Sequence, residues 1–250
     1  MKGARFVLVD ISNTFTKISL ATRSRISPPQ RIPTRELSRP RLLEVLGEHV
    51  ALPAVVASVV PRKNVALIRT FRSPICWVGP DIELGIGIDY PKPASIGADR
   101  LANAVAAAAL YGSPSIVVDF GTAVTFDVIT SEGNYAGGVI APGLNAMTDY
   151  LHDRTALLPK VTLREPTEAI GRSTEAAMLS GAVYGYRGLI SEIIRQIRLE
   201  IPRRKILHIV ATGGDAKLIA GQTKIFTAVS PTLTLEGLRI IATRNFPATA

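Results

Sequence analysis

Two stretches of the chain follow one pattern, and this repeat limits the possible folds more than any other feature of the sequence. The first stretch, Phe6 to Leu20, reads FVLVDISNTFTKISL, and the second, Ser115 to Ile129, reads SIVVDFGTAVTFDVI. In both, an apolar strand ends in an Asp, a tight turn follows, and a second strand carries a Thr. Asp10 and Asp119 therefore occupy equivalent positions in two predicted β-hairpins, one in each half of the chain.

The segments around these hairpins are predicted to alternate between strands and helices. We expect further strands at residues 54–60, 76–78, 137–143 and 206–211, and helices at 41–49, 66–71, 99–111, 144–151, 174–200 and 232–243. Since strand, hairpin and helix return in the same order after half of the chain, we predict an α/β protein with two similar lobes. The predicted lobes are residues 1–112 and 113–250, each a mixed sheet flanked by helices, and the last helix could pack back on the first lobe. Ligands of open α/β sheets bind beyond the strand ends, so we expect the site in a cleft between the lobes, near Asp10, Asp119 and Thr212.

Composition narrows the class of protein. The chain has 250 residues, of which 47% are apolar, so it can bury one large core or two smaller ones. Its single cysteine, Cys76, excludes an internal disulfide, and three scattered His residues with one Cys match no zinc-binding pattern. No apolar run is long enough to span a bilayer, and the N-terminus has no signal-peptide pattern, so we expect a soluble cytoplasmic protein.

The net charge of +9 is concentrated in the first third of the chain. Residues 1–80 hold 13 Lys and Arg against 4 acidic residues, whereas residues 81–250 hold 16 of each sign. A basic segment of this kind could bind nucleic acid, attract an anionic ligand or form a solvated surface. The arginines between Arg23 and Arg41 lie among Ser and Pro, without interleaved aromatic residues or a basic helix. This pattern disfavours nucleic acid as the partner.

The first hairpin turn, DISNT at Asp10–Thr14, could bind an anion together with a metal ion. Backbone amides gathered in such a turn form a concave anion site, to which Asn13 and Thr14 add side-chain donors. The Asp10 carboxylate would repel a phosphate directly, so its expected role is to hold Mg²⁺ through water. The simpler alternative is an Asp/Asn turn stabilised by its own side chains. The repetition of the turn in the second half of the chain favours the functional interpretation.

The sequence GADR, Gly97–Arg100, opens the predicted Ala-rich helix and carries the candidate catalytic carboxylate. Asp99 could accept the proton of a substrate hydroxyl during phosphoryl transfer, while Arg100 could pair with an anionic group of the substrate or with a phosphate. The alternative is that Asp99 only stabilises the helix N-terminus, where a negative charge is favoured, and that Arg100 is a surface charge. The spacing alone leaves both interpretations open.

A Gly-rich turn, TGGDA at Thr212–Ala216, lies between a predicted strand and a predicted helix. Gly213 and Gly214 would let a flat ligand such as adenine approach the backbone, although a tight strand-to-helix connection would use the same residues. Thr174 most simply caps the long helix at 174–200. The chain lacks a GxxxxGK[ST] loop, a GxGxxG turn and a GxSxG elbow, which argues against a P-loop protein, a dinucleotide-binding fold and a serine hydrolase.

Taken together, these motifs resemble the superfamily of actin, heat-shock chaperone ATPases, and acetate and sugar kinases, and within it the type III pantothenate kinases. The matching segments are DISNTFTK (10–17), ASVVP (57–61), YPKPASIGADR (90–100), DFGTAVTFD (119–127), GGVIAPGL (137–144), LP (158–159), GRSTEAAMLSG (171–181) and TGGDA (212–216). They occur in the order of the family and span nearly the whole chain, so together they are specific although each alone is weak. The resemblance implies two lobes of the actin-like (ribonuclease H-like) fold with an ATP cleft between them.

The resemblance also implies an activity, the ATP-dependent phosphorylation of pantothenate at its terminal hydroxyl, which is the first step of coenzyme A biosynthesis. Asp99 would be the general base. The implied pantothenate-binding residues are Tyr90, Gly97, Ala98, Asp99, Arg100 and Thr174. The expected ATP-binding residues are Asp10, Ile11, Ser12, Asn13, Thr14, Phe15, Thr16, Lys17, Thr122, Gly213 and Gly214. Mg²⁺ would bind near Asp10, a potassium or ammonium ion would bind at Asp119, and the protein would be a homodimer.

One position departs from the family pattern. The family usually has Asp-x-Gly-Asn-Thr, and this chain has Ser12 in place of the Gly. If the backbone needs a positive φ there, Ser would cost about 1 kcal/mol, and if the space is needed for a phosphate, ATP binding would weaken. Two other functions remain open from the sequence: a non-catalytic regulator that retains the kinase fold, and a kinase for another small alcohol.

Overall fold

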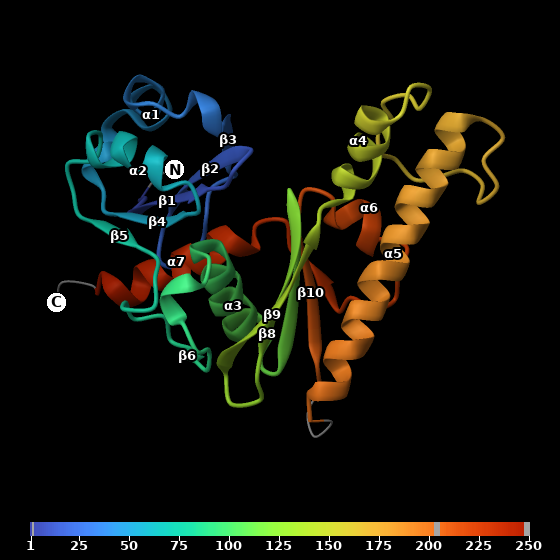
Figure 1. Ribbon diagram of the computed structural model, residues 1–250. Helices are drawn as coiled ribbons and strands as arrows, with labels where there is room; N and C mark the ends of the chain where they lie inside the picture. The colour runs from blue at the N-terminus through green and yellow to red at the C-terminus, as the bar shows by residue number, and fades with distance from the viewer. Residues whose placement is uncertain (2, 203–205, 248–250) are drawn as a thin grey trace. The chain divides into compact units, whose positions relative to one another are not determined.

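The structure is a computed structural model that describes residues 1, 3–202 and 206–247 of the chain. Contacts divide the chain into two compact units. Unit 1 contains Met1–Gly112, the short segment Gly133–Ala136 and the C-terminal segment from Thr232, and unit 2 contains Ser113–Glu132 and Gly137–Pro231. Each unit has a mixed β-sheet flanked by helices, as the sequence predicts (Figure 1). Within the described ranges, no helix combines the length and the apolar character needed to cross a membrane.

The sheet of unit 1 has five strands in the order β3-β2-β1-β4-β5. They are β1 (Phe6–Ile11), β2 (Phe15–Ala21), β3 (Gln30–Pro33), β4 (Ala54–Ser58) and β5 (Ile75–Trp77). β1 pairs antiparallel with β2, which forms the first predicted hairpin, and parallel with β4. Because β1 is central in the sheet and buried along its whole length, its sequence is apolar up to the final Asp-Ile pair.

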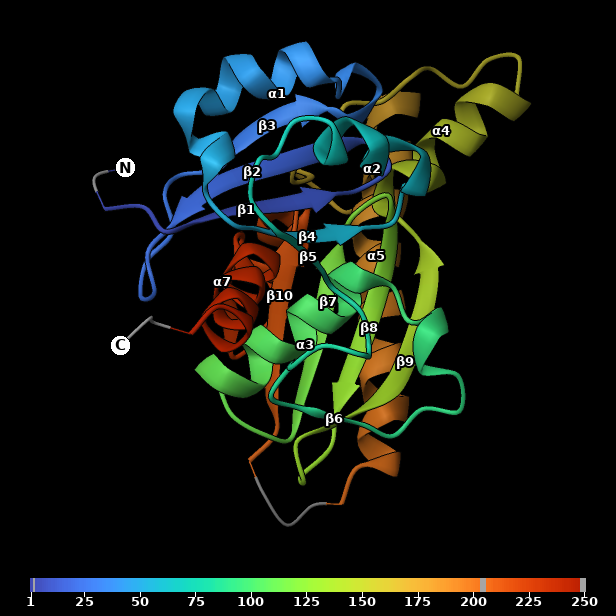
Figure 2. The ribbon, with the colours of Figure 1, turned by 90° about the vertical axis from the view of Figure 1, so that its left-hand side faces the viewer.

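Helices cover both faces of this sheet. On one face, Val7, Val9 and Ile11 of β1 pack with buried side chains of α1 (Arg39–Leu46) and α2 (Pro61–Ile68). On the other face lie α3 (Ala98–Leu110) and α7 (Leu233–Asn245), both in contact with β4 (Figure 2). Successive side chains of a strand point to opposite faces, so β1 contributes to two separate layers of the core.

The two helices on that second face, α3 and α7, approach each other closely. A Cβ atom on Gly237 of α7 would collide with the backbone carbonyl of Ala102 in α3. Nearby, the buried Thr234 hydroxyl donates a hydrogen bond to Oδ1 of Asn103, 2.8 Å away. The Ala-rich sequence of α3 is thus explained by a helix that packs against other elements on several sides.

Unit 2 is built on a second mixed sheet, in which β11 (Ala228–Val229), β10 (His208–Gly213), β7 (Ser115–Phe120), β8 (Ala123–Ile129) and β9 (Asn134–Pro142) follow one another. β7 and β8 form the second predicted hairpin, with Asp119 opposite Thr125. β7 also pairs in parallel with β10. The first residues of β9 belong to unit 1, where they pair with the short strand β6 (Gly87–Ile88).

Among its described residues, unit 2 has the helices α4 (Leu144–Arg154), α5 (Thr174–Glu200) and α6 (Ala216–Ala220). The long helix α5 runs along one face of the sheet, and α4 packs on α5 (Figure 1). Val118 and Phe120 of β7 join Val183 and Tyr186 of α5 in the core of this unit. The core therefore lies between the hairpin strand that carries Asp119 and the long helix α5.

Most of the predicted elements are confirmed, with small shifts at their ends. The helix predicted at 66–71 begins earlier, at Pro61, because proline is well suited to the first turn of a helix. The strand predicted at 206–211 is His208–Gly213. The sequence does not predict β3, β6, β11 or the 3₁₀ helix η1 (Thr34–Glu36), which are too short to show a periodic pattern. Helix α7 belongs to unit 1, although the chain reaches it only after the whole of unit 2.

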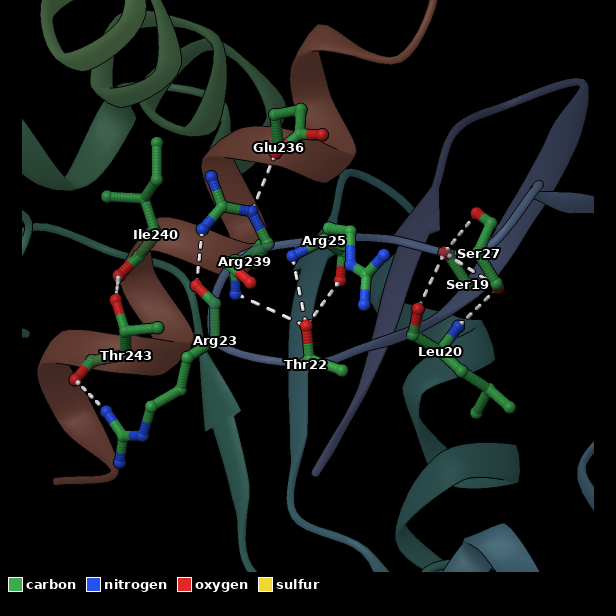
Figure 3. Close-up of polar contacts among 11 residues, drawn as sticks. Ser19, Leu20, Thr22, Arg23, Arg25, Ser27, Glu236, Arg239, Ile240 and Thr243 are labelled. Carbon is green, nitrogen blue, oxygen red and sulfur yellow. Dashed lines mark hydrogen bonds and ion pairs between the residues drawn. The ribbon is translucent and has the colours of Figure 1, made fainter. Parts of the chain in front are cut away.

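Arg23 joins the turn after β2 to the end of α7 (Figure 3). Its Nη2 donates to the carbonyl of Phe246 at 2.7 Å, and its Nη1 donates to that of Thr243 at 3.4 Å. In return, Nη1 of Arg239 donates to the carbonyl of Arg23 at 2.6 Å, while Nε of Arg239 binds Glu236 at 2.7 Å. The last carbonyls of a helix lack partners within the helix, so the Arg23 guanidinium caps α7 and ties it to the sheet.

Arg23→Met should lower the stability of the protein, because it removes this cap while keeping much of the side-chain volume. We expect a loss of about 1–3 kcal/mol in the free energy of unfolding, measured by urea denaturation and by the melting temperature. Arg25→Met is the matched control, since Arg25 lies in the same turn and is exposed. A similar loss in both variants would contradict the capping role.

Candidate active site

The first hairpin ends in a tight turn whose tip is open to solvent. The backbone N–H of Ser12 donates to the carbonyl of Phe15 at 3.2 Å, and Asn13 and Thr14 between them are exposed. In the described ranges, every non-glycine residue has a negative φ, so Ser12 is accommodated without left-handed strain. The cost of about 1 kcal/mol considered for Ser12 therefore does not arise.

The Asp10 carboxylate lies at the base of this turn and is only 2% exposed. The Ser12 hydroxyl donates to Oδ1 at 3.1 Å, and Nζ of Lys17 lies 3.5 Å from Oδ2. A buried carboxylate keeps its charge only when its oxygens are paired in this way. Both oxygens are thus held in defined directions, and the serine that replaces the family's glycine helps to hold one of them.

These contacts fit an indirect magnesium site. Mg²⁺ usually keeps several waters and is bound through one or two carboxylates together with substrate phosphates. Asp10 supplies one carboxylate, and the exposed tip beside it carries the backbone N–H groups and the side chains of Asn13 and Thr14. Such a tip can receive phosphate oxygens. The donor set is therefore suited to a metal–phosphate group rather than to a bare metal ion.

Three other predicted ATP-binding residues of the hairpin lie around its base. Ile11 is fully buried, and the Thr16 hydroxyl lies 3.1 Å from the hydroxyl of Thr34 in η1. The ring of Phe15 is covered by the guanidinium of Arg31, 4.1 Å from the ring centre. The side chains of these three residues thus contribute to the packing of the hairpin.

The GADR segment forms the start of α3, within unit 1. Gly97 is the N-cap residue, Ala98 is buried, and Asp99 is half-buried in the first turn. Oδ1 of Asp99 accepts a hydrogen bond from the backbone N–H of Arg100 at 2.8 Å. This contact orients the carboxylate at a helix N-terminus, where the helix dipole stabilises its charged form. The geometry suits a helix-stabilising residue and an oriented general base equally.

Tyr135 brings two of the predicted substrate-binding residues together. It is fully buried near the start of β9. The guanidinium of Arg100 lies 5.8 Å from its ring centre, and the ring of Tyr90 meets it edge-on at 6.2 Å. These side chains form a basic, aromatic corner beside Asp99. Sequence reasoning missed Tyr135, because only the pairing of β6 with β9 brings it to the segment before α3.

In unit 2, Asp119 lies beside the Gly-rich turn that follows β10. The strand pairing places Thr212 opposite Asp119 and Gly213 opposite Phe120. Gly213 has a φ of +94°, and a Cβ atom there would lie 2.6 Å from Oδ1 of Asp119 and 2.5 Å from the Phe120 carbonyl oxygen. Both the positive φ and the close approach require glycine. Two motifs that are distant in sequence, DFGT and TGGD, thus form one corner rich in oxygen atoms.

This corner offers ligands that suit a monovalent cation. The half-buried carboxylate of Asp119 and the carbonyl of Phe120 face the same glycine. Carboxylate and carbonyl oxygens are the usual ligands of hard cations. Thr122 is exposed at the tip of the same hairpin, and Gly214 is exposed in the neighbouring turn. The predicted cation-binding and ATP-binding positions of unit 2 therefore lie together.

A polar cluster connects the Gly-rich turn to the start of α4. Nδ2 of Asn145 donates to Oδ2 of Asp215 at 3.5 Å, and the Tyr186 hydroxyl donates to the Pro142 carbonyl at 3.1 Å. Burial raises the pKa of Asp215, and burial together with the charge of Asp215 raises the pKa of Tyr186. Tyr186 therefore stays a neutral hydrogen-bond donor. Sequence reasoning did not identify this cluster, whose members come from three separate segments.

The start of α5 differs from the prediction in one detail. Ser173, rather than Thr174, is the N-cap residue, and its Oγ accepts a hydrogen bond from the backbone N–H of Ala176 at 3.2 Å. An N-cap residue has an extended backbone, and Ser173 is the residue that adopts it. Thr174 is the first helical residue and is exposed, so its hydroxyl lies outside the cap.

Solved structures define the class of fold. A Baf family protein from Campylobacter jejuni aligns with a TM-score of 0.65 at 19% identity, over 96% of this chain and 98% of its own. An archaeal actin homologue aligns with a TM-score of 0.55 at 11% identity, over 96% of this chain and 99% of its own. These likenesses show the fold alone. The chain has the fold of actin-like ATPases and sugar kinases, as predicted.

Sequence similarity narrows this class to a family. The family model of type III pantothenate kinases matches residues 6–196. Type III pantothenate kinases from Akkermansia muciniphila and Methylacidiphilum infernorum are 53% and 43% identical to this chain. The alignments cover 96% and 94% of this chain, and 99% and 87% of those relatives. This chain belongs to the type III pantothenate kinase family, which confirms the resemblance drawn from its motifs.

Gly213→Ala should destabilise the protein, because the added methyl group would meet the Asp119 carboxylate and the backbone would keep a positive φ. We expect a loss of about 1–3 kcal/mol, measured by the melting temperature and by urea denaturation. The neighbouring Gly214→Ala is the matched control, since its Cβ would come no closer than 3.9 Å to the Phe120 carbonyl oxygen. Its stability should change by about 0.5 kcal/mol or less. Equal losses of stability in the two variants would show that the close approach at Gly213 is not the reason that this position requires glycine.

Proposed function

We propose that this chain transfers phosphate from ATP to the terminal hydroxyl of pantothenate, giving 4'-phosphopantothenate, and that Asp99 is the general base. Family membership supports the reaction itself: the chain is an ATP-dependent pantothenate kinase of coenzyme A biosynthesis. The choice of base rests on the match of GADR to the family's motif, and the orientation of the Asp99 carboxylate in the first turn of α3, next to Arg100, is compatible with that role.

In the proposed reaction, the hydroxyl oxygen of pantothenate attacks the γ-phosphorus of ATP while the bond to the bridging oxygen of ADP breaks. The proton of the hydroxyl passes to the Asp99 carboxylate. Phosphoryl transfer depends mainly on positioning and on charge stabilisation, so the protein has to align the two substrates. Arg100, held over the ring of Tyr135, is proposed to pair with the carboxylate of pantothenate, and Tyr90 is proposed to contact the same substrate.

The hairpin of unit 1 is the proposed phosphate-binding element. Its exposed tip, with Asn13 and Thr14, would receive the phosphates of ATP, while Asp10 would hold Mg²⁺ through water and Lys17 would add positive charge. Bound Mg²⁺ would neutralise charge on the phosphates. The pairing of both Asp10 oxygens, with the Ser12 hydroxyl and with Lys17, supports this division, because it holds the carboxylate in a fixed orientation.

The Asp119 corner of unit 2 is the proposed binding site for potassium or ammonium. Thr122, Gly213 and Gly214 lie at the same corner and are proposed to contact ATP. The support is geometric. The Asp119 carboxylate and the Phe120 carbonyl both lie close to Gly213, where there is no room for a side chain. A contact between Thr174 and pantothenate stays a prediction.

We also propose a cytoplasmic homodimer. Apolar side chains that are exposed on α4, Met147, Tyr150 and Leu151, support a contact with a second copy of the chain at this helix. The free, half-buried thiol of Cys76 is compatible with a reducing compartment. The role proposed for Asp99 does not depend on whether the protein is a homodimer or on where in the cell it is found.

Asp99→Asn should abolish most of the kinase activity without unfolding the protein. Loss of a general base typically lowers the turnover number by about 100-fold to 10,000-fold, and ATP affinity should change little because Asp99 is not proposed to bind ATP. The measurement is ADP release that depends on pantothenate, with potassium present. Asp81→Asn is the control for loss of one exposed carboxylate from unit 1.

The same assay, repeated with other alcohols and combined with a measurement of ATP binding, separates the competing functions. A wild-type protein that binds ATP but acts only on another alcohol would be a related small-alcohol kinase. A wild-type protein that neither binds ATP nor releases ADP would fit the non-catalytic regulator, which the basic residues 1–80 leave as the second candidate. Full activity in Asp99→Asn would remove Asp99 from the role of general base.

Asp119→Asn should weaken activation by potassium. Replacing a half-buried carboxylate by a neutral amide removes the charge from the proposed ligand, so the potassium concentration for half-maximal activity should rise by about tenfold or more. The measurement is a potassium titration of the initial rate at constant ionic strength. Asp153→Asn, which removes an exposed carboxylate from unit 2, should leave the titration unchanged. An unaltered potassium requirement in Asp119→Asn would contradict the assignment.

A further inference from the structure

Thr34, which lies outside every motif of the sequence analysis, holds the tip of the first hairpin. It is the first residue of η1 and is only 3% exposed. Its hydroxyl donates to the carbonyl of Ser12 at 2.7 Å, and its backbone N–H donates to the carbonyl of Thr14 at 3.0 Å. The two carbonyls stand on either side of Asn13. One residue from a distant segment therefore fixes both ends of the exposed tip.

The hydroxyl of Thr34 has one proton, and that proton is used for Ser12. The hydrogen bond between the hydroxyls of Thr16 and Thr34, 3.1 Å long, must therefore have Thr16 as its donor. Thr34 thus both donates and accepts in a buried chain that runs from β2 through η1 to the tip. Valine has the same shape but can do neither, so it would leave the Ser12 carbonyl and the Thr16 hydroxyl without this partner.

The contact with Ser12 also sets the direction of a nearby donor. The Ser12 carbonyl and the Asn13 N–H belong to the same peptide group, which is planar and trans. In such a group the two point in opposite directions. Because the carbonyl points toward Thr34, the Asn13 N–H points away from it, at the exposed tip of the hairpin.

We propose that Thr34 is a positioning residue for ATP: by anchoring the Ser12 and Thr14 carbonyls, it aims the backbone N–H of Asn13 at a phosphate. The inference rests on the proposed function, in which this hairpin receives the phosphates of ATP. Thr34 itself touches no substrate in this scheme. Its loss should therefore impair the binding of nucleotide and leave the binding of pantothenate intact.

The test is Thr34→Val, with Thr70→Val as the matched control. Thr70 is another buried threonine of unit 1, 5% exposed, whose hydroxyl donates to the Ala66 carbonyl at 2.6 Å near the end of α2. Both variants lose one buried hydroxyl, and Thr34→Val should lose at least as much stability as Thr70→Val, because the Thr34 hydroxyl both donates and accepts. Only Thr34→Val should raise the KM for ATP, by roughly fivefold to tenfold, with the KM for pantothenate unchanged within about twofold. Thr34→Ser, which keeps the hydroxyl, should restore the KM for ATP.

ADP binding should also be measured directly by calorimetry, without pantothenate. Thr34→Val should bind ADP more weakly than Thr70→Val and Thr34→Ser do. If Thr34→Val fails to fold, Thr34→Cys takes its place, since a thiol is a much weaker donor than a hydroxyl. The proposal is overturned if Thr34→Val binds nucleotide as tightly as Thr70→Val does, or if Thr34→Ser is as impaired as Thr34→Val. If the wild type binds ADP but does not phosphorylate pantothenate, the proposed function fails, while the affinities still decide the role of Thr34.

Discussion

A buried negative charge at the end of the central strand is the constraint on which unit 1 depends. Asp10 is placed there by β1, the middle strand of the five-stranded sheet. A charge in that position must be paired, and the hairpin provides both partners locally. Lys17 stands directly opposite Asp10 in the strand pairing, and Ser12 reaches back from the turn. The segment DISNTFTK thus contains the end of a strand, a turn, and the lysine that pairs with the buried carboxylate of the same segment.

The two hairpins share one topology but are supported in different ways. In unit 1, η1 approaches the hairpin, and Thr34 holds the turn by hydrogen bonds. In unit 2, the turn after β10 approaches the hairpin, and Gly213 allows backbone and carboxylate to come close without a side chain between them. The first arrangement directs the N–H of Asn13 to an exposed tip, which suits an anion. The second gathers oxygen atoms, which suits a cation.

Much of this organisation could be predicted from the sequence. The two hairpins follow from the repeated apolar strands with Asp at their ends, and α3 follows from its run of Ala after GADR. These signals are local, because a strand or a helix imposes its periodicity on neighbouring residues. The capping of α5 was placed one residue too late, since Ser173 and Thr174 have the same capping chemistry. Only the backbone conformation distinguishes them.

The sequence by itself determined the longer helices and strands, the family and the positions of the acidic residues, since these depend on patterns between neighbours in the chain. Only the tertiary structure decided which distant residues support them. Tyr135 reaches Arg100 through strand pairing between β6 and β9, and Thr34 reaches Ser12 through the packing of η1 on the hairpin. Such contacts leave no periodic signal, because a single hydroxyl or ring at the right place in space can come from any part of the chain.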